Sequence, residues 1–360
     1  MGALLTAAAA LGPREWGTVT QNSTSQTLEG TNSGAGSGSV LGFGMEGIWD
    51  DERGILHFCG SDHGDGTTDY YTYTESSNNW ARTITDVGLT ASHGYDHLDI
   101  NPSTGDLFLF EYGNLVGPIK LYKLPQGGSA FSLLNNSQGD YVQVANGSCW
   151  WSGSMTGGGA GGTLVFWSCG SGILHFYNPA TNIWFATNDI DGATLPDHYH
   201  GWLSYCPILN VGIFGPGNGN SGNPNIIYRL DSDRSVTQLT NSPLDTGVRG
   251  VNVCREPVTG GFILMGANKL YYLDPTGSGT YTLLNQASDA IPSGVEDPSV
   301  ISNPSTTSCI SFAVPSAGVI VYVSKKTVGS NANMSIYKYA TIAEPPSRSG
   351  GTKSSMLMVA

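Results

Sequence analysis

The chain has 360 residues, of which 50 are glycine and 12% are charged, and its formal net charge is −13. This length fits either two average domains or one closed repeat architecture, and the lack of a basic stripe argues against a nucleic-acid partner. The chain contains no stretch near the ~18 apolar residues needed to span a membrane, so we expect no membrane span.

The N-terminal segment, residues 1–14, contains an apolar run with no Lys or Arg before it. A secretory signal peptide needs a basic leader and a small-residue cleavage site, so this is not a clear signal peptide. We instead expect an N-terminal arm or a short helix that stops at Gly12 and Pro13. The following residues, 15–342, are interpreted as one domain.

Within this domain one sequence pattern recurs six times. It consists of a short apolar run ending in Tyr or Leu, a polar turn, and then an aromatic residue, Thr or Leu. The six copies align on Tyr73, Leu124, Tyr177, Leu230, Leu273 and Tyr339. A repeat of roughly 40 to 50 residues, built only of short strands and Gly, Pro or Asn turns, indicates propeller blades.

Each repeat has two further strands ahead of its aligned strand, joined by a tight turn. In chain order these hairpins are expected within 44–60, 95–113, 148–170, 200–217, 249–266 and 308–324. Together with a fourth, outer strand they give four-stranded antiparallel blades. The fold class is therefore all-β, a closed β-propeller of six blades. A seventh blade hidden in residues 27–40 or 286–307, which are long and poorly patterned, is the alternative.

The last repeat has no outer strand of its own, because the chain passes from residues 339–342 into Glu344 and two prolines. The segment 15–20 resembles the outer strand at 78–84. We therefore expect the N-terminal strand to complete the last blade and close the ring, which removes the exposed sheet edges. Residues 343–360 form a linker and tail for contact with a virion or a second copy; simple disorder is the alternative.

The loops that enter the inner strands and those that join the second and third strands open on one face of a propeller. Five of the seven histidines fall in these loops. The candidate catalytic residues are His93, Tyr95, His97, His198, Tyr199, His200 and Arg249. The candidate substrate-binding residues are Glu111, Trp150, Trp151, Trp202 and Asn218, with the tryptophans expected to be exposed for stacking on sugar rings. Asp62 and His63 are candidate ligands of a divalent metal, zinc or calcium. The alternative is that each histidine is a hydrogen-bonded brace between blades.

The segments SHGYDHLDINPSTGD (92–106) and YNPATNIW (177–184) resemble kelch-type propeller proteins of phage and bacterial genomes. That resemblance covers about Trp16 to Tyr339 and implies architecture rather than chemistry. A looser similarity is to the propeller polysaccharide lyases of the ulvan lyase type, which use His and Tyr with an Arg facing the uronate. It implies that His93 or His97, Tyr95 or Tyr199, and Arg249 take those roles.

Cleavage of a uronate polysaccharide by β-elimination needs a cation for the carboxylate, a base for the C5 proton and an acid for the leaving oxygen. Arg249 supplies the charge, and a His and a Tyr suit the base and the acid. We therefore expect a glycan-directed lyase located outside the cell or on a virion. The alternatives are a non-catalytic glycan- or receptor-binding propeller, and a structural protein whose histidines only brace the blades.

Overall fold

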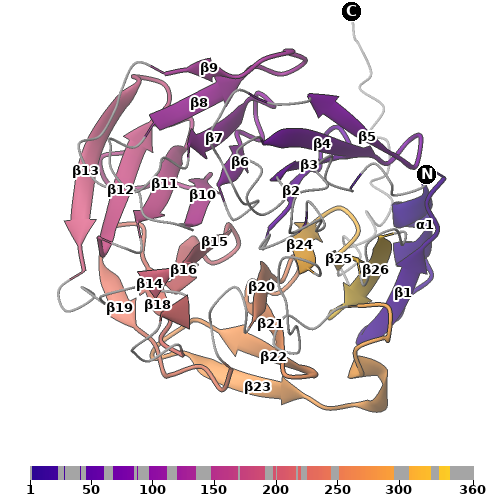
Figure 1. Ribbon diagram of the computed structural model, residues 1–360. Helices are drawn as coiled ribbons and strands as arrows, with labels where there is room; N and C mark the ends of the chain where they lie inside the picture. The colour runs from indigo at the N-terminus through magenta and orange to yellow at the C-terminus, as the bar shows by residue number, and fades with distance from the viewer. Residues whose placement is uncertain are drawn as a thin grey trace, which may run out of the picture.

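The structure is a computed structural model, and it describes most of the chain. The described residues are 2–22, 28, 41, 46–60, 68–84, 87, 97–111, 120–134, 147–168, 171–190, 198–199, 201–215, 218–219, 225–244, 251–295, 308–325 and 332–340. They form six four-stranded antiparallel sheets, arranged as blades around a common centre (Figure 1). The prediction of a six-bladed propeller is confirmed, and the seven-bladed alternative is excluded.

The first three blades each use four consecutive strands, ordered from the centre outward. Blade 1 is β2 (Ile48–Asp50), β3 (Ile55–Gly60), β4 (Asp69–Thr74) and β5 (Asn79–Ile84). Blade 2 is β6 (Leu98–Ile100), β7 (Leu107–Glu111), β8 (Lys120–Leu124) and β9 (Ser132–Leu133). Blade 3 is β10 (Gly147–Trp151), β11 (Thr163–Ser168), β12 (Ile173–Asn178) and β13 (Ile183–Asp189).

The last three blades follow the same order, with one small ribbon added. Blade 4 is β15 (Trp202–Cys206), β16 (Val211–Gly215), β18 (Tyr228–Leu230) and β19 (Val236–Gln238). The ribbon pairs β14 (His198–Tyr199) with β17 (Asn218–Gly219). Blade 5 is β20 (Asn252–Arg255), β21 (Phe262–Gly266), β22 (Lys269–Asp274) and β23 (Thr280–Leu284), followed by the short 3-10 helix η2 (Ala287–Asp289). Blade 6 is β24 (Ser308–Val314), β25 (Val319–Lys325), β26 (Asn333–Lys338) and β1 (Glu15–Val19).

Strand β1 is thus the outer strand of the last blade, as the sequence predicts. It runs antiparallel to β26, with Trp16 opposite Tyr337. The preceding helix α1 (Ala3–Ala9) lies beside β1 and carries the fully buried Leu4. The backbone N–H groups of Leu4 and Leu5 donate to the carboxylate of Glu75, which lies in blade 1. The N-terminal segment therefore completes blade 6 and also fastens it to blade 1.

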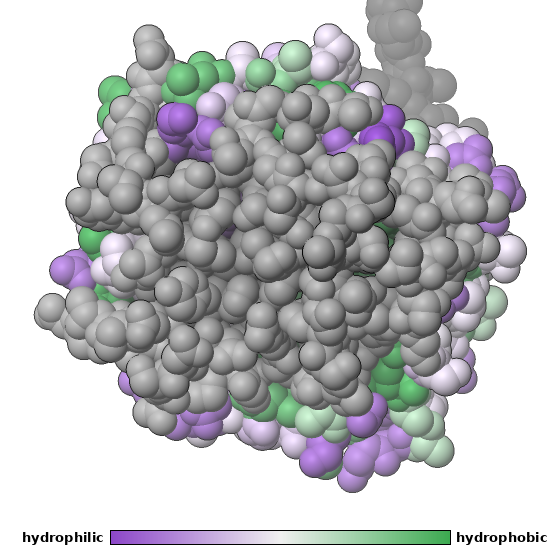
Figure 2. Space-filling model, in the orientation of Figure 1, coloured by the Kyte–Doolittle hydropathy of each residue, from purple (hydrophilic) through white to green (hydrophobic). Residues whose placement is uncertain are grey.

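The core consists of apolar clusters between neighbouring blades rather than one central core. Strand β11, for example, is fully buried along its length because blades 2 and 4 cover its two faces. The five cysteines in the described part of the chain are buried free thiols, as expected, and Cys169 lies outside it. Among the described residues, large exposed apolar side chains are few and scattered, and apolar and polar groups mix around the rim (Figure 2). None of the described helices has the length and hydrophobicity required to cross a bilayer.

In two of the six blades the recurring sequence pattern includes a tyrosine–asparagine contact. In blade 3 the Tyr177 hydroxyl donates to Oδ1 of Asn182 at 2.7 Å, and in blade 1 Tyr73 donates to Asn78 at the same distance. Both asparagines have positive φ angles, 56° and 54°, at the turn into the outer strand. Asn adopts this left-handed conformation more readily than other non-glycine residues. The motif therefore fixes both the turn and the buried tyrosine.

Replacing Asn182 by Ala should lower the free energy of unfolding by about 2 kcal/mol. The change leaves the buried Tyr177 hydroxyl without this acceptor and places a residue with a Cβ in a left-handed conformation that it disfavours. Asn182→Asp keeps an acceptor oxygen and should cost much less. Chemical denaturation of both variants checks this, and equal losses in the two would contradict the explanation.

Candidate functional site

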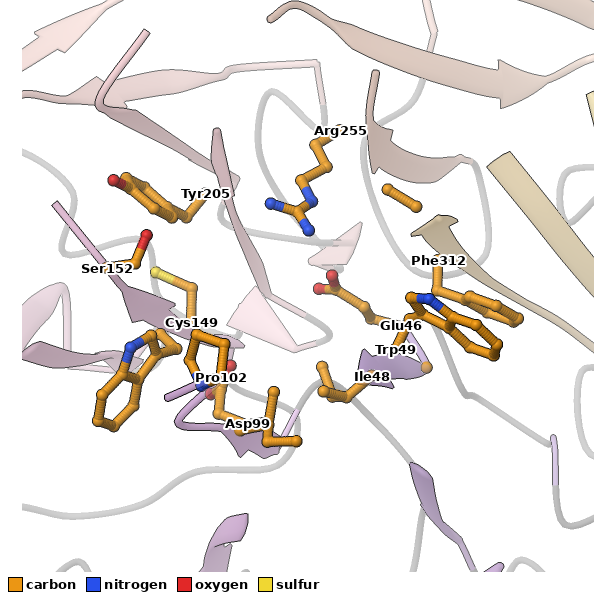
Figure 3. A pocket seen from close by; sticks show the side chains of 14 residues that line it. Glu46, Ile48, Trp49, Asp99, Pro102, Cys149, Ser152, Tyr205, Arg255 and Phe312 are labelled. Atoms are coloured by element: carbon orange, nitrogen blue, oxygen red, sulfur yellow. The ribbon is translucent and has the colours of Figure 1, made fainter. Parts of the chain in front are cut away.

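A cavity of about 120 Å³ lies at the centre of the ring, where all six blades contribute residues (Figure 3). Its polar lining is Glu46, Asp99, Ser152, Tyr205 and Arg255, and its aromatic lining is Trp49, Trp150 and Phe312. Several of these residues lie at or just after the last residue of an inner strand, as Ser152 follows β10 and Arg255 ends β20. The cavity is therefore at the end of the ring where the inner strands finish.

Arg255, at the end of β20 in blade 5, and Glu46, two residues before β2 of blade 1, both line this cavity. Figure 3 shows the guanidinium of Arg255 and the carboxylate of Glu46 pointing toward one another. Within the described residues, however, no carboxylate is within ion-pair distance of the Arg255 guanidinium. Because Arg is always charged and presents a planar fork of donors, the site has a cation available for a carboxylate ligand.

Tyr205 also borders the cavity, but its hydroxyl is engaged within the protein. The hydroxyl donates to Oδ1 of Asn210 at 2.9 Å and accepts from the backbone N–H of Gly153 at 3.0 Å. Burial raises the pKa of Tyr205 above its usual value, despite hydrogen bonds that lower it. This side chain therefore joins blades 3 and 4, and its geometry does not suit a catalytic acid.

His97 is the one predicted catalytic residue whose side chain the structure describes. It directly precedes β6, its side chain is buried, and its ring lies 6.5 Å from that of Phe166 in blade 3. Burial lowers the pKa of His97 to about 4, so the ring is neutral at pH 7 and a weak base. This environment favours the alternative that His97 braces blades 2 and 3.

The expectation that three tryptophans are exposed for sugar stacking is wrong, because all three are buried. Trp151 and Trp202 are 0% and 1% exposed, because each inner strand is covered by the neighbouring blades on both sides. Trp150 is also mostly buried and stacks on Phe108 with ring centroids 5.5 Å apart, but it lines the central cavity. Only Trp150 of the three is placed to contact a ligand there.

Glu111 has its partners within blade 2. Its Oε2 accepts a hydrogen bond from the Tyr122 hydroxyl at 3.0 Å and pairs with Nζ of Lys120 at 2.9 Å. These contacts link strands β7 and β8 at the position where Glu111 and Lys120 are opposite each other. The carboxylate therefore fastens these two strands.

The structure brings two further predicted residues together. Tyr199 in β14 is opposite Asn218 in β17, and His198 is in the same ribbon; their side chains are not among those described. The other predicted site residues lie outside the described residues: Asp62, His63, His93, Tyr95, His200 and Arg249. Among the described residues, no group of three or more His, Cys, Asp or Glu is placed to hold a metal ion.

The sequence analysis missed the charged residues of the central cavity: Glu46, Asp99 and Arg255. One signal was available, since Asp99 and Arg255 interrupt or end inner strands that are otherwise apolar. A charged residue in an innermost strand either pairs or faces the central channel.

No protein-family model matches the chain, and no curated protein matches it either. Solved structures do resemble it. One is an auxiliary nutrient binding protein from Bacteroides thetaiotaomicron, 13% identical, with a TM-score of 0.50 over 87% of this chain and 76% of that one. Two others have TM-scores of 0.47 and 11% identity: virginiamycin B lyase from Staphylococcus aureus (80% of this chain, 92% of that one) and a chain of the Mitotic Checkpoint Complex (89% and 94%). At these identities the likeness concerns the fold alone, and the chain is a β-propeller.

Proposed function

We propose that this protein binds an acidic glycan, with a uronate carboxylate held by Arg255 in the central cavity. The observation that carries the proposal is the Arg255 guanidinium, which faces the cavity and forms no ion pair among the described residues. A bidentate Arg–carboxylate contact is both strong and directional.

The rest of the lining complements a sugar. Carboxylates accept hydrogen bonds from hydroxyl groups, and Glu46 and Asp99 provide two of them beside Arg255. Trp49, Trp150 and Phe312 provide aromatic surface for the C–H face of a sugar ring. The cavity, about 120 Å³, is smaller than the ~300–1,000 Å³ of most ligand pockets, so it suits one sugar unit at a time.

We propose further that the protein cleaves this glycan by β-elimination. This proposal rests on the looser resemblance to propeller lyases and on His93, Tyr95, His198, Tyr199, His200 and Arg249, whose side chains are outside the described set. Arg255 is the last residue of its inner strand, β20, whereas His97 lies directly before the first residue of another inner strand, β6. A cation that neutralises a uronate must be close to the base that removes its C5 proton, so Arg255 would bind a different sugar unit from the one that reacts. The extracellular or virion location belongs to the same proposal.

Incubating the protein with a panel of uronate polysaccharides tests both levels of the proposal. Titration calorimetry reports binding, and absorbance of the unsaturated product reports elimination. Saturable binding without product leaves the non-catalytic binder as the function. If no uronate glycan binds and none yields product, the proposal is refuted and a structural role is favoured.

Arg255→Ala should weaken binding of the best uronate glycan by about 10- to 100-fold, because it removes a charge-assisted contact. Lys269→Ala is the matched control, since it removes one positive charge from the same blade at an exposed position. It should leave the affinity unchanged. Equal effects of the two substitutions would show that only net charge matters.

A further inference from the structure

A second and larger cavity, about 520 Å³, is lined by residues of blades 1 and 2. These two blades are neighbours in the ring (Figure 1). The two walls of the cavity differ in chemistry. The wall from blade 1 carries His57, Tyr70, Thr72, Thr74 and Thr83, whereas the wall from blade 2 carries Leu107, Leu124, Pro125 and three glycines. We call this cavity the inter-blade groove. One side is thus rich in hydroxyl groups and the other is apolar.

His57 is the most unusual residue of the groove. It is 8% exposed, and its Nδ1 lies 2.5 Å from the Tyr70 hydroxyl. Burial is the main reason that the pKa of His57 falls to about 4, and burial also raises the pKa of Tyr70, so the imidazole is neutral and the phenol protonated. In the tautomer in which the phenol donates to Nδ1, the ring proton is on Nε2; in the other tautomer Nε2 is an acceptor. In both, Nε2 has no hydrogen-bond partner among the described residues, and a buried polar atom left in this state costs stability.

The other blades show what this position otherwise contains. His57 is two residues before Cys59 in β3, so both side chains face blade 2. His57 follows the residue that pairs with Tyr73 of the third strand. At the equivalent position of the other second strands the side chains are apolar and belong to the inter-blade clusters: Phe108, Val165, Ile213, Ile263 and Val321. Blade 1 therefore departs from a packing rule that the other five blades obey. Apolar side chains would close the groove, and this chain has polar ones there instead.

The two charged residues that line the groove, Asp50 and Arg53, neutralise each other. Nη1 of Arg53 donates to Oδ2 of Asp50 at 2.9 Å. With the amide of Gln126 oriented to satisfy its neighbours, Nε of Arg53 donates to it across the groove. Little net charge remains for an ionic ligand. By contrast, the hydroxyls of Thr72 and Thr83 share one hydrogen bond of 2.9 Å, which leaves further donor and acceptor capacity.

We propose that the inter-blade groove is a second binding site, which takes an uncharged oligosaccharide segment. The hydroxyl groups of such a ligand match the threonine wall and the orphan Nε2 of His57, and its C–H face matches the wall of Leu107, Leu124 and Pro125. The volume is within the range of pockets that enclose small ligands. This site does not depend on the central cavity or on the proposed binding of acidic glycans.

The test is titration of the purified protein with uncharged trisaccharides: maltotriose, cellotriose, xylotriose and mannotriose. At least one should bind saturably, and Thr72→Val/Thr83→Val should weaken that binding by about 10-fold or more. The double change removes both partners of one hydrogen bond while keeping their shape, so little stability should be lost. Thr282→Val, an exposed threonine in the outer strand of blade 5, and Arg255→Ala are the controls, and both should leave the affinity unchanged.

A second measurement uses the wild-type protein alone. The imidazole NMR signals of His57 should shift on titration with the bound trisaccharide, because the ligand supplies a hydrogen-bond partner for Nε2. The proposal is overturned if no trisaccharide binds, if the double variant binds as tightly as the wild type, or if the signals of His57 do not move at saturation. Loss of trisaccharide binding in Arg255→Ala would also overturn it, by placing that ligand in the central cavity.

Discussion

Deletion of residues 2–20 should abolish the cooperative unfolding transition of this protein. The deletion removes α1 and β1, so β26 becomes an unpaired edge strand. It also removes Leu4, Ala8 and Val19, which are buried in the cluster between blades 6 and 1. At ~1.5–3 kcal/mol for a large apolar side chain, the loss is on the order of 5 kcal/mol, comparable with the whole stability of many domains. Thermal unfolding followed by circular dichroism checks this.

A shorter deletion and a rescue experiment separate ring closure from general damage. Deleting residues 2–10 removes α1 but keeps β1, and should cost only part of the stability. A synthetic peptide of residues 2–22, added to the protein that lacks 2–20, should restore a cooperative transition by pairing with β26. If the protein without residues 2–20 unfolds as the full chain does, the ring is not closed by this strand.

Asp289→Asn should destabilise the protein by about 3 kcal/mol, the second-largest effect that we expect. The carboxylate accepts hydrogen bonds from Nε of Arg14 at 2.6 Å, the Tyr337 hydroxyl at 2.6 Å and the backbone N–H of Gln286 at 2.7 Å. Its side chain is buried, and Arg14 immediately precedes β1. Removing one partner of a buried ion pair leaves the other charge uncompensated. Asp274→Asn, a turn carboxylate in the same outer region, is the control.

The ion pair between Asp289 and Arg14 also predicts how the difference in free energy of unfolding between wild type and Asp289→Asn depends on pH. Burial raises the pKa of Asp289, but the hydrogen bonds from Arg14, Tyr337 and Gln286 outweigh it, and the pKa falls below its usual 3.8. A carboxyl group with a lowered folded-state pKa stabilises the protein above its unfolded-state pKa, and this contribution is lost as the pH falls through the folded-state value. The gap between wild type and Asp289→Asn should therefore be constant near neutrality and narrow below about pH 4. A gap that widens on acidification would contradict this explanation.

The fold could be predicted from the sequence because each blade repeats its own local signals. The apolar run and the polar turn recur because every blade must make the same chain reversal, and in blades 1 and 3 this turn is fixed by Tyr73 with Asn78 and by Tyr177 with Asn182. Closure of the ring by the N-terminal strand was predictable because the last repeat has no outer strand of its own and residues 15–20 resemble one. Local pattern and global ring closure agree in this chain, which is typical of foldable sequences.

The candidate site was much less predictable, because it depends on contacts between blades. Trp151 and Trp202 were expected at the surface, but neighbouring blades cover both faces of an inner strand. Arg255 and Glu46 are far apart in sequence and meet only once the ring is closed. The inter-blade groove was missed for a similar reason, since His57 within a strand is notable only when compared with the apolar residues that face the next blade elsewhere.

The central claim, that Arg255 binds a uronate carboxylate, is tested most directly by combining a change in the protein with a change in the ligand. The affinities of wild type and Arg255→Ala are measured for a uronate polysaccharide and for the same polymer with its carboxyl groups reduced to alcohols. We predict that reduction weakens binding to the wild type by about 10-fold or more and has no further effect on Arg255→Ala, as expected for two groups that contact each other. An equal loss in both proteins, or a wild type that does not distinguish the two polymers, would contradict the claim.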